Sequence, residues 1–309
     1  MAEDQGVNGT IWNKEVNAIL SWFNWEAIGD IDMDIVGDDY KKYGIDTFMK
    51  IDSSLSNLPL SAILEAKRYA TNSFSQQVLQ DWVNRLDKKL NKLKFSEELQ
   101  AKFPILCDCK NMNLGIIVIW FHDTTNYLSF QENFKDALKN IKVSNRTKAS
   151  GSYNKILIID NEIITRLCSL HTAITSYESS NNRVISFFYP SILRDGKATV
   201  RNKVLSPEYI FSKVILAEAK GSNGDSENVI FYFGNTGLDS LKQLRDQLSK
   251  CSVLDEEKKL VLFIYYSDDE FRKIKPELEK IFNDTKELSI QFMDTITDLP
   301  GEIKTIGNE

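Results

Sequence analysis

Three residues in the first quarter of the chain have the types and spacing of a metal-dependent hydrolytic site. Asp46 lies in one apolar segment, and Glu65 and Lys67 lie two positions apart in another. Residues two apart on a β-strand point to the same face, so Glu65 and Lys67 would project together. A hairpin of this length can bring Asp46 beside Glu65. Because adjacent carboxylates repel unless a cation joins them, the pair predicts either a divalent-metal site or a carboxyl dyad with a raised pKa.

The tripeptide Glu-x-Lys alone decides little, because it occurs five times in this chain. The other four pairs are Glu218 with Lys220, Glu256 with Lys258, Glu257 with Lys259, and Glu302 with Lys304. The first of these ends a segment with helical spacing, where residues two apart do not face one another, and the others lie in a polar loop or the tail. Plainer roles exist for the first pair too: Glu65 and Lys67 could form a cross-strand ion pair, and Asp46 could bind a neighbouring lysine.

Composition narrows the chemistry that such a site could perform. The chain has 309 residues, of which 42% are hydrophobic, which is enough for two compact domains. A net charge of −6 argues against a protein that coats nucleic acid by bulk charge. Four cysteines without framework spacing and two histidines make a zinc cluster hard to assemble, so carboxylates would have to hold a metal, which favours Mg²⁺ or Mn²⁺. An acidic, polar start and no long apolar run predict a cytoplasmic protein without a membrane segment.

The elements that must position these residues fall into two α/β halves. Hydrophobic spacing predicts, in order, a helix at 10–25, strands at 26–36, 44–52 and 60–70, a helix at 73–93, and a buried strand at 114–123. A polar stretch near residue 150 suggests a boundary, with domains at 1–148 and 149–309. In the second domain, strands at 155–160, 184–190, 228–234, 259–266 and 288–294 alternate with helices at 161–178, 207–220, 237–250 and 268–282, which predicts a mostly parallel sheet covered on both faces.

An αβββαβ order, with Asp46 on the second strand and Glu65-x-Lys67 on the third, resembles the PD-(D/E)xK, or restriction-endonuclease-like, nuclease superfamily. The resemblance implies that Asp46, Glu65 and the carbonyl of Ala66 ligate Mg²⁺ or Mn²⁺. It also implies that Lys67 orients the attacking water or helps to deprotonate it. The expected reaction is hydrolysis of phosphodiester bonds in nucleic acid, with double-stranded DNA favoured.

A second layer of the pattern is similar to the Mrr-like branch of that superfamily. The strand motif continues as "EAKRY", and the following helix carries "LQDWV", in which Gln80 is the matching glutamine. The resemblance implies that Gln80 positions the water, a ligating carboxylate or a phosphate. It also assigns to Glu15, on the apolar face of the first helix, the role of a second metal ligand.

The helix that follows the motif is basic, with Arg85, Lys88 and Lys89 close behind Gln80. Together with Arg68 these residues are candidates for contacts with the phosphate backbone, although the charge alone favours a solvated helix face. The layout of a nuclease followed by an α/β module resembles prokaryotic restriction or antiphage defence subunits, which implies a companion subunit or a homodimer. Two further hypotheses remain open: a catalytically inactive, nuclease-like subunit that binds nucleic acid or assembles a complex, and a second domain that binds a partner or senses a ligand.

Overall fold

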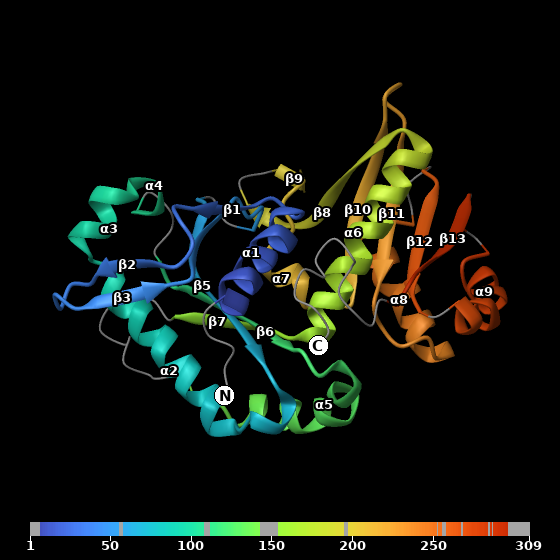
Figure 1. Cartoon of the computed structure of the whole chain (residues 1–309). Helices are drawn as coiled ribbons and strands as arrows, with labels where there is room; N and C mark the ends of the chain where they lie inside the picture. Colours follow the sequence, from blue (N-terminus) through green and yellow to red (C-terminus); the bar gives the residue numbers. More distant parts are fainter. Residues whose placement is uncertain are drawn as a thin grey trace. The chain divides into compact units, whose positions relative to one another are not determined.

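The computed structural model describes residues 7–55, 58–107, 112–142, 154–194, 197–251, 253–254, 258–266, 268–283, 285 and 287–295. The chain divides into two compact units, the first ending at Ile164 and the second beginning at Thr165 (Figure 1). Within these residues, every helix is too short or too polar to cross a membrane. Each unit has its own sheet and its own hydrophobic core.

The first unit is built on a five-stranded sheet. Its strands are β1 (Trp25–Ile28), β4 (Thr47–Ile51), β5 (Leu60–Tyr69), β6 (Leu114–Phe121) and β7 (Lys155–Ile159), in that spatial order. The pairs β1–β4 and β4–β5 are antiparallel, whereas β5–β6 and β6–β7 are parallel. A separate two-stranded hairpin, β2 (Met33–Val36) with β3 (Lys42–Ile45), is inserted between β1 and β4.

Helices cover both faces of this sheet. On one face, α1 (Val7–Ser21) packs Trp12 against Trp120 of β6, with ring centroids 6.0 Å apart. On the other, α2 (Gln76–Leu93) and α5 (Thr124–Lys139) share a core with Ile117 and Ile119, which alternate with Trp120 along β6. Short helices η1 (Thr71–Ser73), α3 (Glu97–Lys102) and α4 (Pro104–Cys107) complete the unit. In the main sheet the predicted αβββαβ order is confirmed as α1, β1, β4, β5, α2 and β6. The strand expected at 26–36 is divided between β1 and β2, and the one expected at 44–52 is interrupted at Asp46, between β3 and β4.

The boundary between the units differs from the one expected at 148/149. The segment at 155–160 was expected to open the second sheet, but β7 pairs in parallel with β6, from Leu114 opposite Lys155 to Val118 opposite Ile159. The first unit therefore extends to Ile164. A drop in apolar content marks a loop, and it does not reveal whether the strand after the loop returns to the same sheet.

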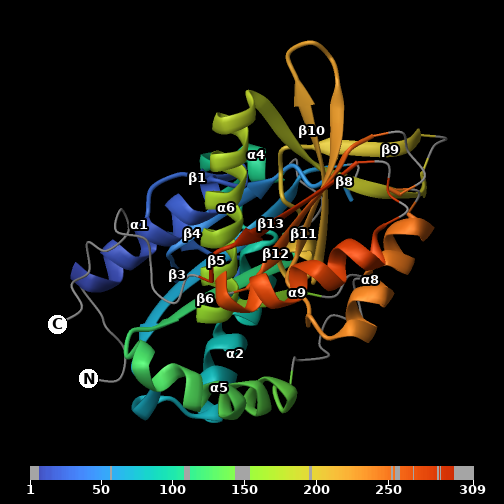
Figure 2. The same ribbon diagram turned by 90° about the vertical axis from the view of Figure 1, so that its right-hand side faces the viewer.

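The second unit holds a six-stranded sheet in the order β13-β12-β11-β10-β8-β9. Its elements begin with α6 (Asn161–Asn181), whose first turn up to Ile164 belongs to the first unit. The other elements along the chain are β8 (Arg183–Arg194), β9 (Lys197–Asn202), α7 (Pro207–Ile210), β10 (Val214–Gly221), β11 (Ser226–Tyr232), α8 (Leu238–Lys250), β12 (Leu260–Tyr265), α9 (Asp268–Ile281) and β13 (Leu288–Met293). Figure 2 shows α8 and α9 lying beside each other along the sheet, and both contribute to one core.

This sheet is mixed and not mostly parallel as expected. Only β11–β12 and β12–β13 are parallel among its five pairings. The difference arises at 207–220, which was expected to be helical: after the single turn of α7 the chain forms β10, which turns at Gly224 (φ +88°) into β11. The first half of β10, from Val214 to Ala217, is continuously apolar and so carries no alternation that would separate a strand from a helix.

Candidate active site

The chain reaches the site at the junction between two strands. Asp46 follows β3 directly and precedes β4, whose Thr47 pairs with Leu64 of β5. The next position along β5 is Glu65, so the antiparallel ladder sets Asp46 beside it. Asp46 also accepts a hydrogen bond through Oδ2 from the amide of Ala66, at 2.8 Å. The predicted meeting of Asp46 with the Glu65–Lys67 strand is therefore present.

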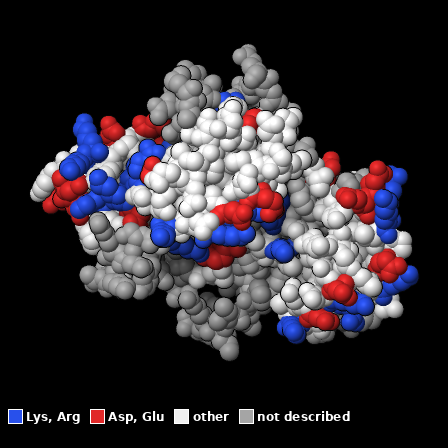
Figure 3. Space-filling view, turned by 90° about the horizontal axis from the view of Figure 1, so that it is seen from below, with Lys and Arg blue, Asp and Glu red and all other residues white. Residues whose placement is uncertain are grey.

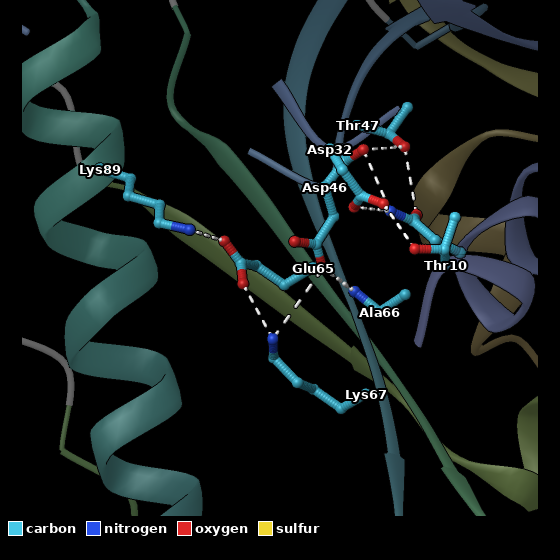
Figure 4. Close-up of polar contacts among 9 residues, drawn as sticks. Thr10, Asp32, Asp46, Thr47, Glu65, Ala66, Lys67 and Lys89 are labelled. Carbon is cyan, nitrogen blue, oxygen red and sulfur yellow. Dashed lines mark hydrogen bonds and ion pairs between the residues drawn. The ribbon is translucent and has the colours of Figure 1, made fainter. Parts of the chain in front are cut away.

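Four charged side chains form one cluster at this point: Asp46, Glu65, Lys67 and Lys89 (Figure 4). The Nζ atom of Lys67 lies 3.2 Å from Glu65 Oε2 and 3.9 Å from Asp46 Oδ2. Lys89 reaches across from α2 and forms an ion pair with Glu65 Oε1. The side chain of Glu65 is 11% exposed, so this is a charged cluster held largely out of solvent.

The two carboxyl groups differ in their proton affinity. Burial raises the pKa of Asp46 and the nearby charge of Glu65 raises it further, to about 6, while Lys67 offsets only part of the rise. Burial acts in the same direction on Glu65, but Lys67 and Lys89 outweigh it and leave the pKa of Glu65 below its ordinary value. Glu65 is thus held ionised, and Asp46 carries a negative charge that its surroundings do not fully compensate.

The donor set fits a small divalent cation. Among the described residues no three Asp, Glu, His or Cys side chains gather to form a closed cage, so the side-chain ligands at this point would be the two carboxylates. The Ala66 carbonyl is a further ligand that the resemblance implies. Mg²⁺ is commonly held by one or two carboxylates and completes its shell with water and substrate phosphate. Within the described part of the chain, Oδ1 of Asp46 makes no hydrogen bond or ion pair, and its charge is undercompensated. The residues therefore fit Mg²⁺ or Mn²⁺.

The main chain of Asp46 is fixed by a polar network that sequence reasoning did not find. Its carbonyl accepts hydrogen bonds from the amide of Asp32 (3.0 Å), the side chain of Asn13 (3.1 Å) and the hydroxyl of Thr47 (2.7 Å). Asn13 also donates to the carboxylate of Asp32. These bonds tie the strand junction to α1, which restrains the position of the Asp46 carboxylate.

Gln80 is not a member of the charged cluster. Its amide donates to the carbonyl of Lys142 at 2.7 Å, and its carbonyl accepts from the amide of Lys142 at 2.9 Å. It lies nine residues before Lys89 on α2, which corresponds to roughly 13 Å along a helix axis. In this structure Gln80 joins α2 to the chain that leaves α5, and the catalytic role implied by the resemblance stays a prediction.

Glu15 and Arg68 belong to the other side of the sheet. Arg68 follows Lys67 on β5 and so points to the opposite face, the one that α1 covers. Glu15 is buried on α1, at 7% exposure, whereas the cluster around Glu65 faces α2. Glu15 as a second metal ligand and Arg68 as a phosphate contact therefore remain predictions that the four-residue cluster does not include.

Lys89 has a different place from the one expected. It was grouped with Arg85 and Lys88 as a phosphate contact, but it is largely buried and paired with Glu65. A sequence signal existed: Lys89 lies three residues after Leu86 and four before Leu93, both fully buried, so it borders the apolar stripe of α2. A lysine at such a border needs an acidic partner inside the fold.

Arg85 and Lys88 remain on the exposed side of α2. With Lys89 and Lys92 they follow helical spacing, so the four form a basic stripe that includes Lys89 of the charged cluster. Part of this charge is already neutralised, because Lys92 lies 3.1 Å from Asp38. Figure 3 shows basic and acidic side chains interspersed on the face that it displays, without one continuous basic field.

Among the other Glu-x-Lys pairs, only Glu218 with Lys220 is fully described. This pair lies on β10 and not at the end of a helix, so the two side chains do share a face. Glu218 is bound by Arg201 and by Lys258, which lies 2.9 Å away, and within the described residues it belongs to no group of three possible metal ligands. Glu256, Glu257, Glu302 and Lys304 lie outside the described residues.

Comparison with known proteins agrees with this geometry. The family model described as the GAPS4 protein PD-(D/E)XK nuclease domain matches residues 1–163, which is more than half of the chain and ends one residue before the unit boundary at Ile164. Searches of curated proteins and of solved structures gave no match. The match does not extend to the Mrr-like branch, which stays a prediction. The chain belongs to the GAPS4 PD-(D/E)XK nuclease family.

Proposed function

We propose that this protein is a metal-dependent endonuclease that hydrolyses phosphodiester bonds, with double-stranded DNA as the favoured substrate. The observation that carries the proposal is the cluster of Asp46, Glu65, Lys67 and Lys89, in which two carboxylates share one lysine within 4.0 Å. A divalent cation bound by Asp46, Glu65 and the Ala66 carbonyl would supply a Lewis acid that acidifies the attacking water and stabilises charge on the scissile phosphate.

The residues of the chain have separable roles in this reaction. Asp46 offers a charge that is poorly compensated, and the Ala66 amide fixes one of its oxygens. Glu65 is kept ionised by its two lysines. Lys67 lies between the carboxylates, where its ammonium group can hydrogen-bond to the water or to a phosphate oxygen. Lys89 is a positioning residue, because it acts through Glu65.

The exposed part of the basic stripe supplies a path for the substrate backbone. Arg85 and Lys88 are exposed on the same helix that carries Lys89 to the cluster. Contacts of this kind give affinity without sequence choice and weaken as salt is raised. We infer that the duplex approaches along α2, where local positive charge partly offsets a net charge of −6.

The biological setting is part of the same proposal. The layout of a nuclease unit followed by an α/β unit resembles that of prokaryotic restriction or antiphage defence subunits. On that ground we propose a role in defence, in the cytoplasm, together with a companion subunit or as a homodimer.

The proposal is tested by cleavage of linear and supercoiled double-stranded DNA in Mg²⁺, in Mn²⁺ and in EDTA. Wild type is compared with Glu65→Gln and Lys67→Met. Glu218→Gln is the matched control, because Glu218 begins the same Glu-Ala-Lys tripeptide on another strand and is also bound by two cations. We expect metal-dependent cleavage by wild type and the control, and none by the two site variants.

Cleavage that continues in EDTA or in Glu65→Gln would refute the assignment. An inert wild type would be assayed again as a complex co-purified from its native host. If that complex is inert with both metals, the function is that of a nuclease-like binding or assembly subunit.

A further inference from the structure

The second unit repeats the strand order and strand directions of the first. From one edge of the main sheet, the strands of the first unit are β1, β4, β5, β6 and β7, paired antiparallel, antiparallel, parallel and parallel. In the second unit, the strands β8, β10, β11, β12 and β13 are paired in the same succession. The extra strand β9 extends the sheet beyond β8.

The helices repeat in the same places along the chain. In each unit one helix precedes the first strand, one connects the third strand to the fourth, and one connects the fourth to the fifth. These helices are α1, α2 and α5 in the first unit and α6, α8 and α9 in the second. Each unit also has an insertion at the same point of the chain, between its first and second antiparallel strands. The insertion is β2–β3 between β1 and β4 in the first unit and β9–α7 between β8 and β10 in the second.

The helices occupy corresponding faces as well. In the second unit, α8 and α9 share a core with Leu262 and Ile264 of β12. On the opposite face α6 packs Tyr177 edge-on against Phe263, which alternates with those residues. The same division separates α2 and α5 from α1 in the first unit. Connections between neighbouring parallel strands are almost always right-handed, so the two arrangements also share their hand.

The positions of the second unit that correspond to the charged cluster of the first can therefore be identified. In the first, Glu65 lies on the third strand, faces the crossover helix α2 and pairs with Ile117 of the fourth strand. In the second, the residues of β11 that face α8 at this level are Ile230 and Tyr232, which pair with Leu262 and Ile264. Their antiparallel partners on β10, in the place of Asp46, are Leu216 and Val214.

Apolar packing thus replaces the charged cluster. Ile230 is fully buried and Tyr232 is 5% exposed. The sequence from Asn228 to Gly237 contains no Asp or Glu. The acidic residues of these strands, Glu218 and Glu227, lie toward the start of β11, where Glu218 pairs with Asn228, and each is bound by cationic side chains.

We propose that residues 161–293 form a second copy of the nuclease fold whose active-site positions are filled with apolar side chains, so that each chain carries a single catalytic centre. The comparison of the folds stands on the strand order and the helix placement. The location of the one centre at Asp46 and Glu65 rests on the proposed function. A break through both strands of a duplex then requires two chains or two successive nicks.

Metal binding by the full chain tests this inference, with free Mn²⁺ measured by electron paramagnetic resonance and DNA cleavage assayed in parallel. Wild type is compared with the double variant Asp46→Asn/Glu65→Gln. The control is Glu218→Gln/Glu227→Gln, which neutralises the acidic residues of β10 and β11. Circular dichroism melting verifies that each protein is folded, and the single variant Glu218→Gln replaces the control if the double variant is not.

We expect the bound Mn²⁺ and the cleavage to disappear in Asp46→Asn/Glu65→Gln and to persist in the control. Mn²⁺ binding or cleavage that survives in Asp46→Asn/Glu65→Gln would overturn the inference, because a second centre would then exist. A wild type that neither binds Mn²⁺ nor cleaves DNA would overturn the proposed function and leave the second unit without a centre, as inferred.

Discussion

Replacing Asp46 by asparagine is expected to stabilise the metal-free protein at neutral pH. The carboxyl of Asp46 has a pKa of about 6, raised from 3.8 by burial and by the charge of Glu65. A carboxyl with a raised pKa favours the folded state while it is protonated. That contribution is present below pH 3.8 and is lost as the pH rises through 6. At pH 7.5 the wild type therefore carries the cost of an ionised Asp46, and asparagine does not.

The size of the expected stabilisation follows from the pKa shift of Asp46. A displacement of about two pKa units corresponds to roughly 3 kcal/mol at 1.36 kcal/mol per unit. Because the side chain of Asp46 is 23% exposed, solvent screening reduces this, and we expect a gain of about 1–2 kcal/mol. Asparagine can still accept the hydrogen bond from Ala66, so the substitution removes the charge and retains that contact.

Urea unfolding followed by tryptophan fluorescence measures this change. All five tryptophans of the chain lie within the first 120 residues, so the signal reports on the first unit alone. The gain of Asp46→Asn should be present at pH 7.5 in EDTA and should shrink toward pH 4.5. Added Mn²⁺ should stabilise wild type and not the variant, because only wild type retains both carboxylates to bind it.

Glu65→Gln is a control for which the opposite change in the free energy of unfolding is expected. The pKa of Glu65 is lowered, so its ionised form stabilises the folded state above its ordinary pKa of 4.5, and that contribution is lost as the pH falls. Glu65→Gln should therefore destabilise the first unit at pH 7.5, since it leaves Lys67 and Lys89 with one partner fewer. If Asp46→Asn is destabilised at pH 7.5 in EDTA, or if Mn²⁺ stabilises both proteins equally, the reasoning about the site is wrong.

Three further substitutions separate positioning from structural roles. Lys89→Met should lower the cleavage rate about 10- to 100-fold, as is typical when the partner of a metal ligand is lost. Lys89→Arg should retain more activity, because it keeps the positive charge. An equal loss of activity in both variants would contradict a charge-based role. Gln80→Ala should lower the free energy of unfolding by about 1–2 kcal/mol, because it removes two hydrogen bonds to Lys142, and it should leave the cleavage rate unchanged. A loss of cleavage in a folded Gln80→Ala protein would instead support the catalytic role implied by the resemblance. Asn13→Ala should weaken Mn²⁺ binding in a titration, because the Asp46 carbonyl loses a donor, and unchanged binding would show that the network does not restrain Asp46.

The hydrophobic pattern of the sequence predicted an element correctly where one face of that element is apolar and the other is polar. The helix expected at 73–93 is present as α2 with its Ser75 cap, because Leu79, Trp82, Leu86 and Leu90 form an unambiguous stripe. The pattern failed at 207–220, because the apolar run from Val214 to Ala217 in β10 has no alternation that would distinguish a strand from a helix. The boundary at 148/149 failed for a related reason, since β7 is joined to its sheet by pairing with β6 and not by any property of the linker.

The sequence by itself determined the residue types of the site, the strand spacing that gives Glu65 and Lys67 a common face, and the αβββαβ order of the first unit, because these depend on contacts between residues close along the chain. Only the tertiary structure decided that Lys89 joins the cluster while Gln80 is bound to Lys142, since both residues lie on one helix and their partners are distant in sequence. The repeat of the fold in the second unit was equally hidden. It consists of strand directions and helix faces, which apolar side chains of many kinds can satisfy, so it leaves no trace in residue identity.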